Sequence, residues 1–238
     1  MTLDIHTVSS VPDASIGAQQ LLQEFAVYGR FYERPICGKN EQLRDRLEIA
    51  PRPWPLQRVL QNPPDLMVIM MNPGGSRPLS ALWDAGAHQG FVVAMPDRTQ
   101  YQIMRMLLAA QRLGLPWWHA RIFNLSDLRT PKSALMLQKI KAYQTDDSHS
   151  LFSKQRKKEC SHYFELNSTP VLCAWGLNPQ LNMNAELALS AIQGHPLLGI
   201  TADGILYRHP LPQRHDLQLQ WLSQIEAQMK LLNTSKVQ

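Results

Sequence analysis

Four short runs of apolar residues stand out along the chain. They cover residues 66–71 (LMVIMM), 120–125 (ARIFNL), 171–175 (VLCAW) and, more weakly, 204–208. Apolar and polar positions do not alternate in the first three, which is typical of strands covered on both faces of a parallel sheet. The pattern therefore predicts four buried strands.

Helical patterns occupy the segments around these runs. They cover residues 15–28, 99–113, 131–143, 153–164, 180–192 and 216–232. Thr130 followed by Pro131 is a favourable helix start, because proline suits the first helical position. Strands that alternate with helices of this length indicate βαβ units, so we expect an α/β fold built as a three-layer sandwich.

Length and composition fit one folded domain. The chain has 238 residues, of which 44% are hydrophobic, enough to bury a core. We expect a single domain over 1–238, with a helical extension at 1–60, a core at 64–215 and a C-terminal helix at 216–232. Without an apolar run long enough for a bilayer or a secretory signal, we expect a cytoplasmic protein that does not contact membranes.

Charge and cysteine content narrow the classes of function. The 24 basic and 19 acidic side chains give a net charge of +5, which is compatible with a polyanionic partner. Cys37, Cys160 and Cys173 are far apart, so they predict neither a disulfide framework nor a metal site. Walker A, GxGxxG and HExxH motifs are absent, which argues against common NTPases, dehydrogenases and metalloproteases.

Candidate chemistry follows the strands, because ligands of α/β sheets bind beyond the carboxyl ends of the strands. The first strand leads into residues 72–76 (NPGGS), which alone indicate only a turn. Asn124 ends the second strand and suits either a helix cap or a contact with a base edge. His209 follows the fourth strand and is held rigidly between an arginine and two prolines.

Taken in order, these segments resemble the uracil-DNA glycosylase superfamily. Residues 71–74 (MNPG) resemble its first motif in the asparagine-containing form, Asn124 resembles its pyrimidine-reading asparagine, residues 174–176 (AWG) resemble a structural strand end, and residues 209–212 (HPLP) resemble its second motif. The resemblance covers about residues 64–215. It implies a central four-stranded parallel sheet, cleavage of the N-glycosidic bond between a base and deoxyribose, and no metal or other cofactor.

The resemblance also implies roles for individual residues. Asn72 matches the residue that positions the attacking water, and His209 matches the donor to the pyrimidine O2. An amide cannot take a proton from water, so we expect a slow enzyme. Candidate base-binding residues are Asn124, Phe91, Gly74 and Asp127, with Trp83 competing with Phe91 as the stacking ring and core packing as the alternative for both rings. Candidate DNA-binding residues are Ser76, Arg77, Leu211, Gln213 and Arg214.

The first motif departs from the uracil-specific pattern. That pattern has an aromatic residue soon after the proline, where it blocks groups on C5 of the pyrimidine, whereas this chain has Gly74, Gly75 and Ser76. We therefore expect a pocket for uracil or, preferably, a C5-modified pyrimidine such as the hypermodified bases of phage DNA. Asn124 suits uracil or cytosine, depending on the orientation of its amide. Asp127 suits a cytosine amine.

Two other classes of function stay open. One is a non-catalytic nucleotide- or DNA-binding module on the same fold, and the other is an enzyme that acts on free nucleosides. The sequence favours a monomeric glycosylase that acts on single- or double-stranded DNA in repair or in defence against foreign DNA. The basic run of Lys154, Arg156, Lys157 and Lys158 is interpreted as a solvated helix face.

Overall fold

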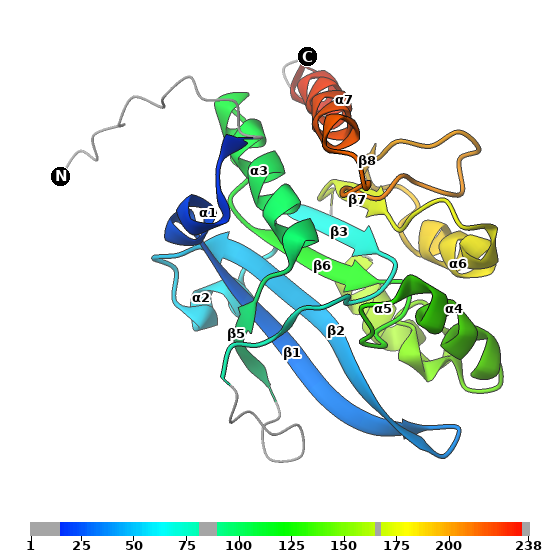
Figure 1. Cartoon of the computed structure of the whole chain (residues 1–238). Helices are drawn as coiled ribbons and strands as arrows, with labels where there is room; N and C mark the ends of the chain where they lie inside the picture. Colours follow the sequence, from blue (N-terminus) through cyan, green and yellow to red (C-terminus); the bar gives the residue numbers. More distant parts are fainter. Residues whose placement is uncertain (1–14, 81–89, 165–167, 235–238) are drawn as a thin grey trace.

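The chain folds around one eight-stranded sheet. The computed structural model (Figure 1) describes residues 15–80, 90–164 and 168–234. The strands are β1 (Phe25–Ile36), β2 (Lys39–Pro51), β3 (Leu66–Met70), β4 (Arg77–Pro78), β5 (Phe91–Met95), β6 (Ala120–Asn124), β7 (Val171–Ala174) and β8 (Leu197–Leu198). Their order is β4-β5-β1-β2-β6-β3-β7-β8. The expected α/β class is confirmed.

The sheet is mixed and larger than expected. Strand β3 pairs in parallel with β6 and β7, and β7 pairs in parallel with β8. Strand β1 is antiparallel to β2 and β5, β2 is antiparallel to β6, and β4 is antiparallel to β5. The antiparallel strands extend the sheet beyond the β6 edge of the parallel set.

The fourth predicted strand, at residues 204–208, is wrong. Tyr207 makes only isolated bridges to Gly176 and Thr201, and the short strand β8 lies earlier in the chain. The Asp203 Oδ1 atom accepts hydrogen bonds from the backbone N–H groups of Ile205 and Leu206, at 2.9 and 2.8 Å. A turn therefore uses the donors that a strand would offer to a neighbour.

Helices cover both faces of the sheet (Figure 1). They are α1 (Ala18–Glu24), α2 (Leu56–Gln61), α3 (Arg98–Arg112), α4 (Ser133–Ala142), α5 (Lys157–Phe164), α6 (Asn182–Ala191) and α7 (His215–Thr234). Helices α1, α3 and α7 contribute Leu21, Ile103 and Ile225 to the core on one face, while α4, α5 and α6 pack on the other. Among the described residues, no helix has the length and apolar character needed to cross a membrane.

The expected helical extension at residues 1–60 is wrong for the described part. Helix α1 ends at Glu24, and the long strands β1 and β2 occupy most of the segment that follows. Buried positions alternate with less buried ones along the first half of β1, the two-residue period of a strand. Strand β2 of the β1–β2 hairpin pairs with β6, so side chains of the hairpin lie next to the parallel half of the sheet.

Candidate functional site

A cleft of about 290 Å³ opens at the carboxyl end of β3. Its lining comes from the end of β3 and the following turn, the start of α3, the segment before α4, the β2 strand and the His209 loop. The lining residues are Arg44, Met70, Met71, Asn72, Pro73, Gly74, Gly75, Asp97, Arg98, Thr99, Gln100, Thr130, Pro131, Ser133 and His209. Asn72, Gly74 and His209, which were singled out in the sequence, thus lie around one cavity.

Asn72 is fixed by the segment that precedes α4. Its Nδ2 atom donates to the Thr130 carbonyl oxygen at 2.7 Å and more weakly to the Leu128 carbonyl oxygen at 3.5 Å. The amide orientation is therefore set, and the Oδ1 atom remains as an acceptor. An oriented amide oxygen can hold a water molecule but cannot act as a strong base.

Gly74 adopts a left-handed backbone conformation, with φ +64°. A Cβ atom at this position would lie 3.0 Å from the Asp97 Oδ2 atom. The glycine therefore allows both the turn after Asn72 and the close approach of the α3 N-terminus.

His209 faces the cleft as a neutral hydrogen-bond donor. Its Nδ1 atom accepts from the Leu211 backbone N–H at 3.1 Å, so we assign the ring proton to Nε2. Burial lowers the pKa of His209 below 6.5. The loop is anchored by the Trp221 Nε1 atom, which donates to the Arg208 carbonyl oxygen at 3.3 Å.

Asp97 and Arg44 are cleft residues that the sequence reasoning missed. The Asp97 Oδ1 atom accepts from the backbone N–H groups of Thr99 and Gln100, which forms the N-cap of α3. In sequence, Asp97 with Gln100 has the signature of a capping box, and nothing there indicates a second role. Arg44 lies in the segment for which a helix was expected.

Asn124 is fully buried beside the cleft rather than on its lining. It pairs with Met70 in the β3–β6 register, and Met70 lines the cleft. Neither the amide oxygen nor the amide nitrogen of Asn124 has a hydrogen-bond partner in the described part of the chain. Unpaired buried amides are uncommon in folded proteins, and each one needs an explanation.

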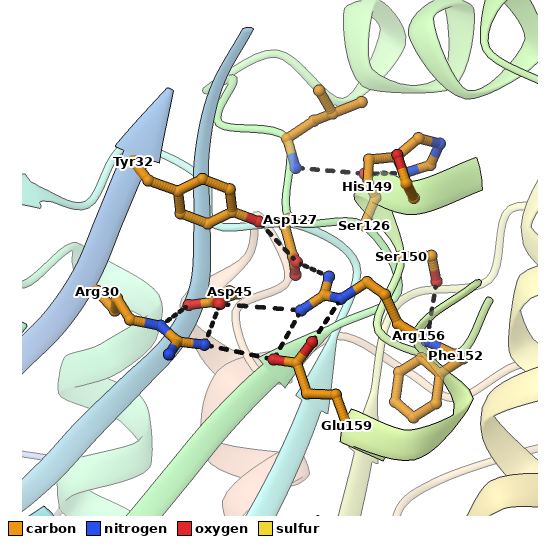
Figure 2. Close-up of polar contacts among 12 residues, drawn as sticks. Arg30, Tyr32, Asp45, Ser126, Asp127, His149, Ser150, Phe152, Arg156 and Glu159 are labelled. Carbon is orange, nitrogen blue, oxygen red and sulfur yellow. Dashed lines mark hydrogen bonds and ion pairs between the residues drawn. The ribbon is translucent and has the colours of Figure 1, made fainter. Parts of the chain in front are cut away.

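Asp127 lies in an ion-pair network instead of the cleft lining (Figure 2). Its Oδ2 atom pairs with Arg156 and accepts a long hydrogen bond of 3.5 Å from the Tyr32 hydroxyl. Burial raises the pKa of Asp127 to about 7, although the Arg156 guanidinium opposes this shift. Asp45 and Glu159 also contact Arg156, at 3.8 and 2.9 Å.

The network joins the β1–β2 hairpin to α5, as Figure 2 shows. Arg30 on β1 pairs with Asp45 on β2 and with Glu159 on α5. The Arg156 side chain is only 11% exposed, so the expected solvated face of the basic run is wrong at this residue. Removing one member of such a network would leave a buried charge uncompensated.

Phe91, the first aromatic candidate, does not line the cleft. Phe91 begins β5, and its ring lies under the Arg46 guanidinium at 4.5 Å. Trp83 lies outside the described residues. Ser76 is buried, with its carbonyl oxygen bound by Arg129 at 3.1 Å, and Arg77 is exposed on β4.

Leu211 lies in a second hollow next to the cleft. This hollow, of about 310 Å³, is lined by Ala18, Arg98, Tyr101, Gln102, Arg105, Leu211, His215, Gln218 and Leu219. Arg98 lines both cavities. Gln213 and Arg214 are exposed nearby in sequence, and Arg214 pairs with Asp216.

Comparison with known protein families, with curated proteins and with solved structures finds no match for this chain.

Proposed function

We propose that the protein is a DNA glycosylase that hydrolyses the N-glycosidic bond of a flipped-out pyrimidine and leaves an abasic site. The observation that carries the proposal is the meeting of Asn72 and His209 at one cleft, although they are far apart in the sequence. Both belong to segments that resemble motifs of the uracil-DNA glycosylase superfamily. The parallel order β6-β3-β7-β8 supports the same resemblance.

The cleft has a donor for the charge that develops in this reaction. When the bond to C1′ breaks, its electron pair leaves with the base, and negative charge accumulates on the pyrimidine. The neutral His209 ring offers its Nε2–H to the pyrimidine O2, and a preorganised donor of this kind typically lowers a barrier by about 2.7–4 kcal/mol.

The cleft also has groups that suit the attacking water. The Asn72 Oδ1 atom orients the water, whose oxygen forms the new bond to C1′. The Asp97 carboxylate lies in the same lining, and its Oδ2 atom accepts the proton that the water loses. Asn72 and Asp97 thus divide positioning and proton transfer between two side chains.

The turn after Asn72 leaves space for a group on C5 of the pyrimidine. Neither Gly74 nor Gly75 has a side chain, and a Cβ atom at Gly75 would meet nothing within 4 Å. The next hollow, with Leu211, Arg98 and Arg105 on its lining, suits the flanking DNA, because cations bind phosphates and an apolar side chain can fill the base stack.

An abasic-site assay tests the proposal. Wild-type protein is incubated with single- and double-stranded DNA that contains uracil, mismatched bases or C5-modified pyrimidines, including glucosylated phage DNA. We expect alkali-labile sites with the wild type and with the exposed control variant Asn62→Ala, but not with Asn72→Ala. DNA binding without abasic sites on any substrate would contradict the proposal and favour a non-catalytic binding module.

A further inference from the structure

Arg44 is a buried cation whose side chain has no hydrogen-bond or ion-pair partner among residues 15–80, 90–164 and 168–234. Arg44 is 1% exposed. Its Nε and Nη1 atoms are inaccessible to solvent and form no hydrogen bond with a described residue. Its side chain makes no ion pair with any residue that the structure describes. Burial lowers the pKa of Arg44 to about 10, so the group is still charged at neutral pH. Buried charges in proteins are normally paired.

A β-bulge directs Arg44 toward the cleft. In the β1–β2 pair, Arg30 lies opposite Arg46 and Phe31 lies opposite Arg44, so Asp45 is the extra residue. Phe31 packs in the core cluster on the α3 face of the sheet, and cross-strand partners share a face. Arg44 therefore lies on that face, where it lines the cleft. Bulges commonly re-aim side chains next to functional sites.

Arg46 on the same strand is a useful comparison, because its guanidinium has partners within the protein. The Arg46 Nε atom is also buried without a hydrogen bond, but Arg46 forms an ion pair with the buried Glu48 at 2.6 Å, donates to the Tyr163 hydroxyl at 3.3 Å and stacks over the Phe91 ring. The charges of Asp97, Asp127 and Asp45 favour the Arg44 cation, but Arg44 forms no side-chain hydrogen bond or ion pair with them. Its donors are therefore available to a ligand.

A second unpaired buried group lies close by in the sheet. Asn124 ends β6 next to Met70, and the Arg44 backbone N–H donates to the Asp127 carbonyl oxygen, three residues further along, at 2.9 Å. Two side chains from adjacent strands thus have unused hydrogen-bonding capacity next to the same cavity. Of the two, Arg44 lines the cleft, so a polar ligand there would contact Arg44.

We propose that Arg44 is the specificity-determining residue of the cleft, which selects bases with a keto or carboxylate oxygen on the edge that faces it. The inference rests on the proposed function and deepens it. A guanidinium only donates hydrogen bonds, and arginine pairs with acceptor edges of bases. An amino group, as on cytosine, would set donor against donor in a site sealed from water. The Asn124 amide suits either edge, so Arg44 decides between them.

Stability gives the first test. We expect Arg44→Met to unfold in urea at the same or a higher midpoint than the wild type, because the substitution removes an unpaired buried charge and retains an unbranched side chain. The matched control is Arg46→Met, which should unfold at a lower midpoint because it leaves Glu48 with fewer partners. A loss for Arg44→Met as large as that for Arg46→Met, or a failure to fold, would overturn the inference.

Binding gives the second test. The probes are single-stranded oligonucleotides with one 2′-fluoro-2′-deoxyuridine or one 2′-fluoro-2′-deoxycytidine, in which the fluorine suppresses cleavage. We expect the wild type to bind the uracil probe about tenfold more tightly, within the range of one good arginine–base contact. Arg44→Met should bind both probes alike. An unchanged preference in Arg44→Met, or no preference in the wild type, would overturn the inference.

These tests separate the inference from the proposed function. The binding assay does not require turnover, so a preference that depends on Arg44 would stand even if no substrate gave abasic sites. Abasic sites with equal binding of both probes would support the glycosylase and refute the role of Arg44.

Discussion

Exchanging each of the two glycines after Asn72 for alanine tests the geometry of the cleft turn. Gly74 has φ +64°, and its added Cβ would lie 3.0 Å from the Asp97 Oδ2 atom. The left-handed conformation alone costs a non-glycine residue about 1–2 kcal/mol. Gly75 has no left-handed φ, and an added Cβ meets nothing within 4 Å. Alanine there should stabilise by about 0.4–1 kcal/mol, because it restricts the unfolded chain.

The two variants should therefore differ in the free energy of unfolding by about 2 kcal/mol, with Gly74→Ala the less stable. Urea denaturation followed by circular dichroism measures this difference if the m-values agree. Gly74→Ala should also slow any reaction in the cleft, because the new methyl group displaces Asp97. Equal stability of the two variants, or a more stable Gly74→Ala, would refute the turn geometry and the site built on it.

Three further predictions concern single side chains. The free energy of unfolding of Asp97→Asn should stay within a few tenths of a kcal/mol of the wild-type value, because asparagine caps helices as well as aspartate does. Its rate of abasic-site formation should fall about 10²–10⁴-fold. An unchanged rate would exclude Asp97 as the base. Burial lowers the pKa of His209 below its usual 6.5, so His209 binds fewer protons in the folded protein than in the unfolded chain. The contribution of neutral His209 to stability is therefore complete above pH 6.5 and is lost as the pH falls through the lowered pKa. His209→Gln should weaken this pH dependence in urea titrations, and an identical profile would contradict the assignment. Arg156→Met should lower the free energy of unfolding by about 3–5 kcal/mol, because it strands the buried Asp127 carboxylate; a loss below about 1 kcal/mol would show that this network is not structural.

Strands β3, β6 and β7 could be predicted from the sequence, because apolar runs are local signals, whereas the two-residue strand β8 could not. The segments expected at residues 66–71 and 99–113 correspond to β3 and α3 within a residue or two. Asn72 and His209 both line the cleft, although the segment before His209 is a turn and not the expected strand.

The β1–β2 hairpin could not be predicted in the same way. Strand β2 carries Arg44, Asp45, Arg46 and Glu48 in succession with little interruption, and a charged segment of this kind normally indicates a solvated surface. All four are buried. Three of them have partners from distant segments: Asp45 pairs with Arg156, Arg46 donates to the Tyr163 hydroxyl on α5, and Glu48 pairs with Arg121 on β6. The position of Arg44 at the cleft therefore could not be predicted from local patterns.

The measurement that tests the central claim most directly is the mass-spectrometric detection of free base. Wild-type protein and Asn72→Ala are incubated with the same modified and unmodified DNA, and the small molecules are separated from the strands. We expect one released pyrimidine for each abasic site with the wild type and none with Asn72→Ala. Intact DNA that is bound by the wild type, with no free base released from any substrate, would contradict the proposed glycosylase activity.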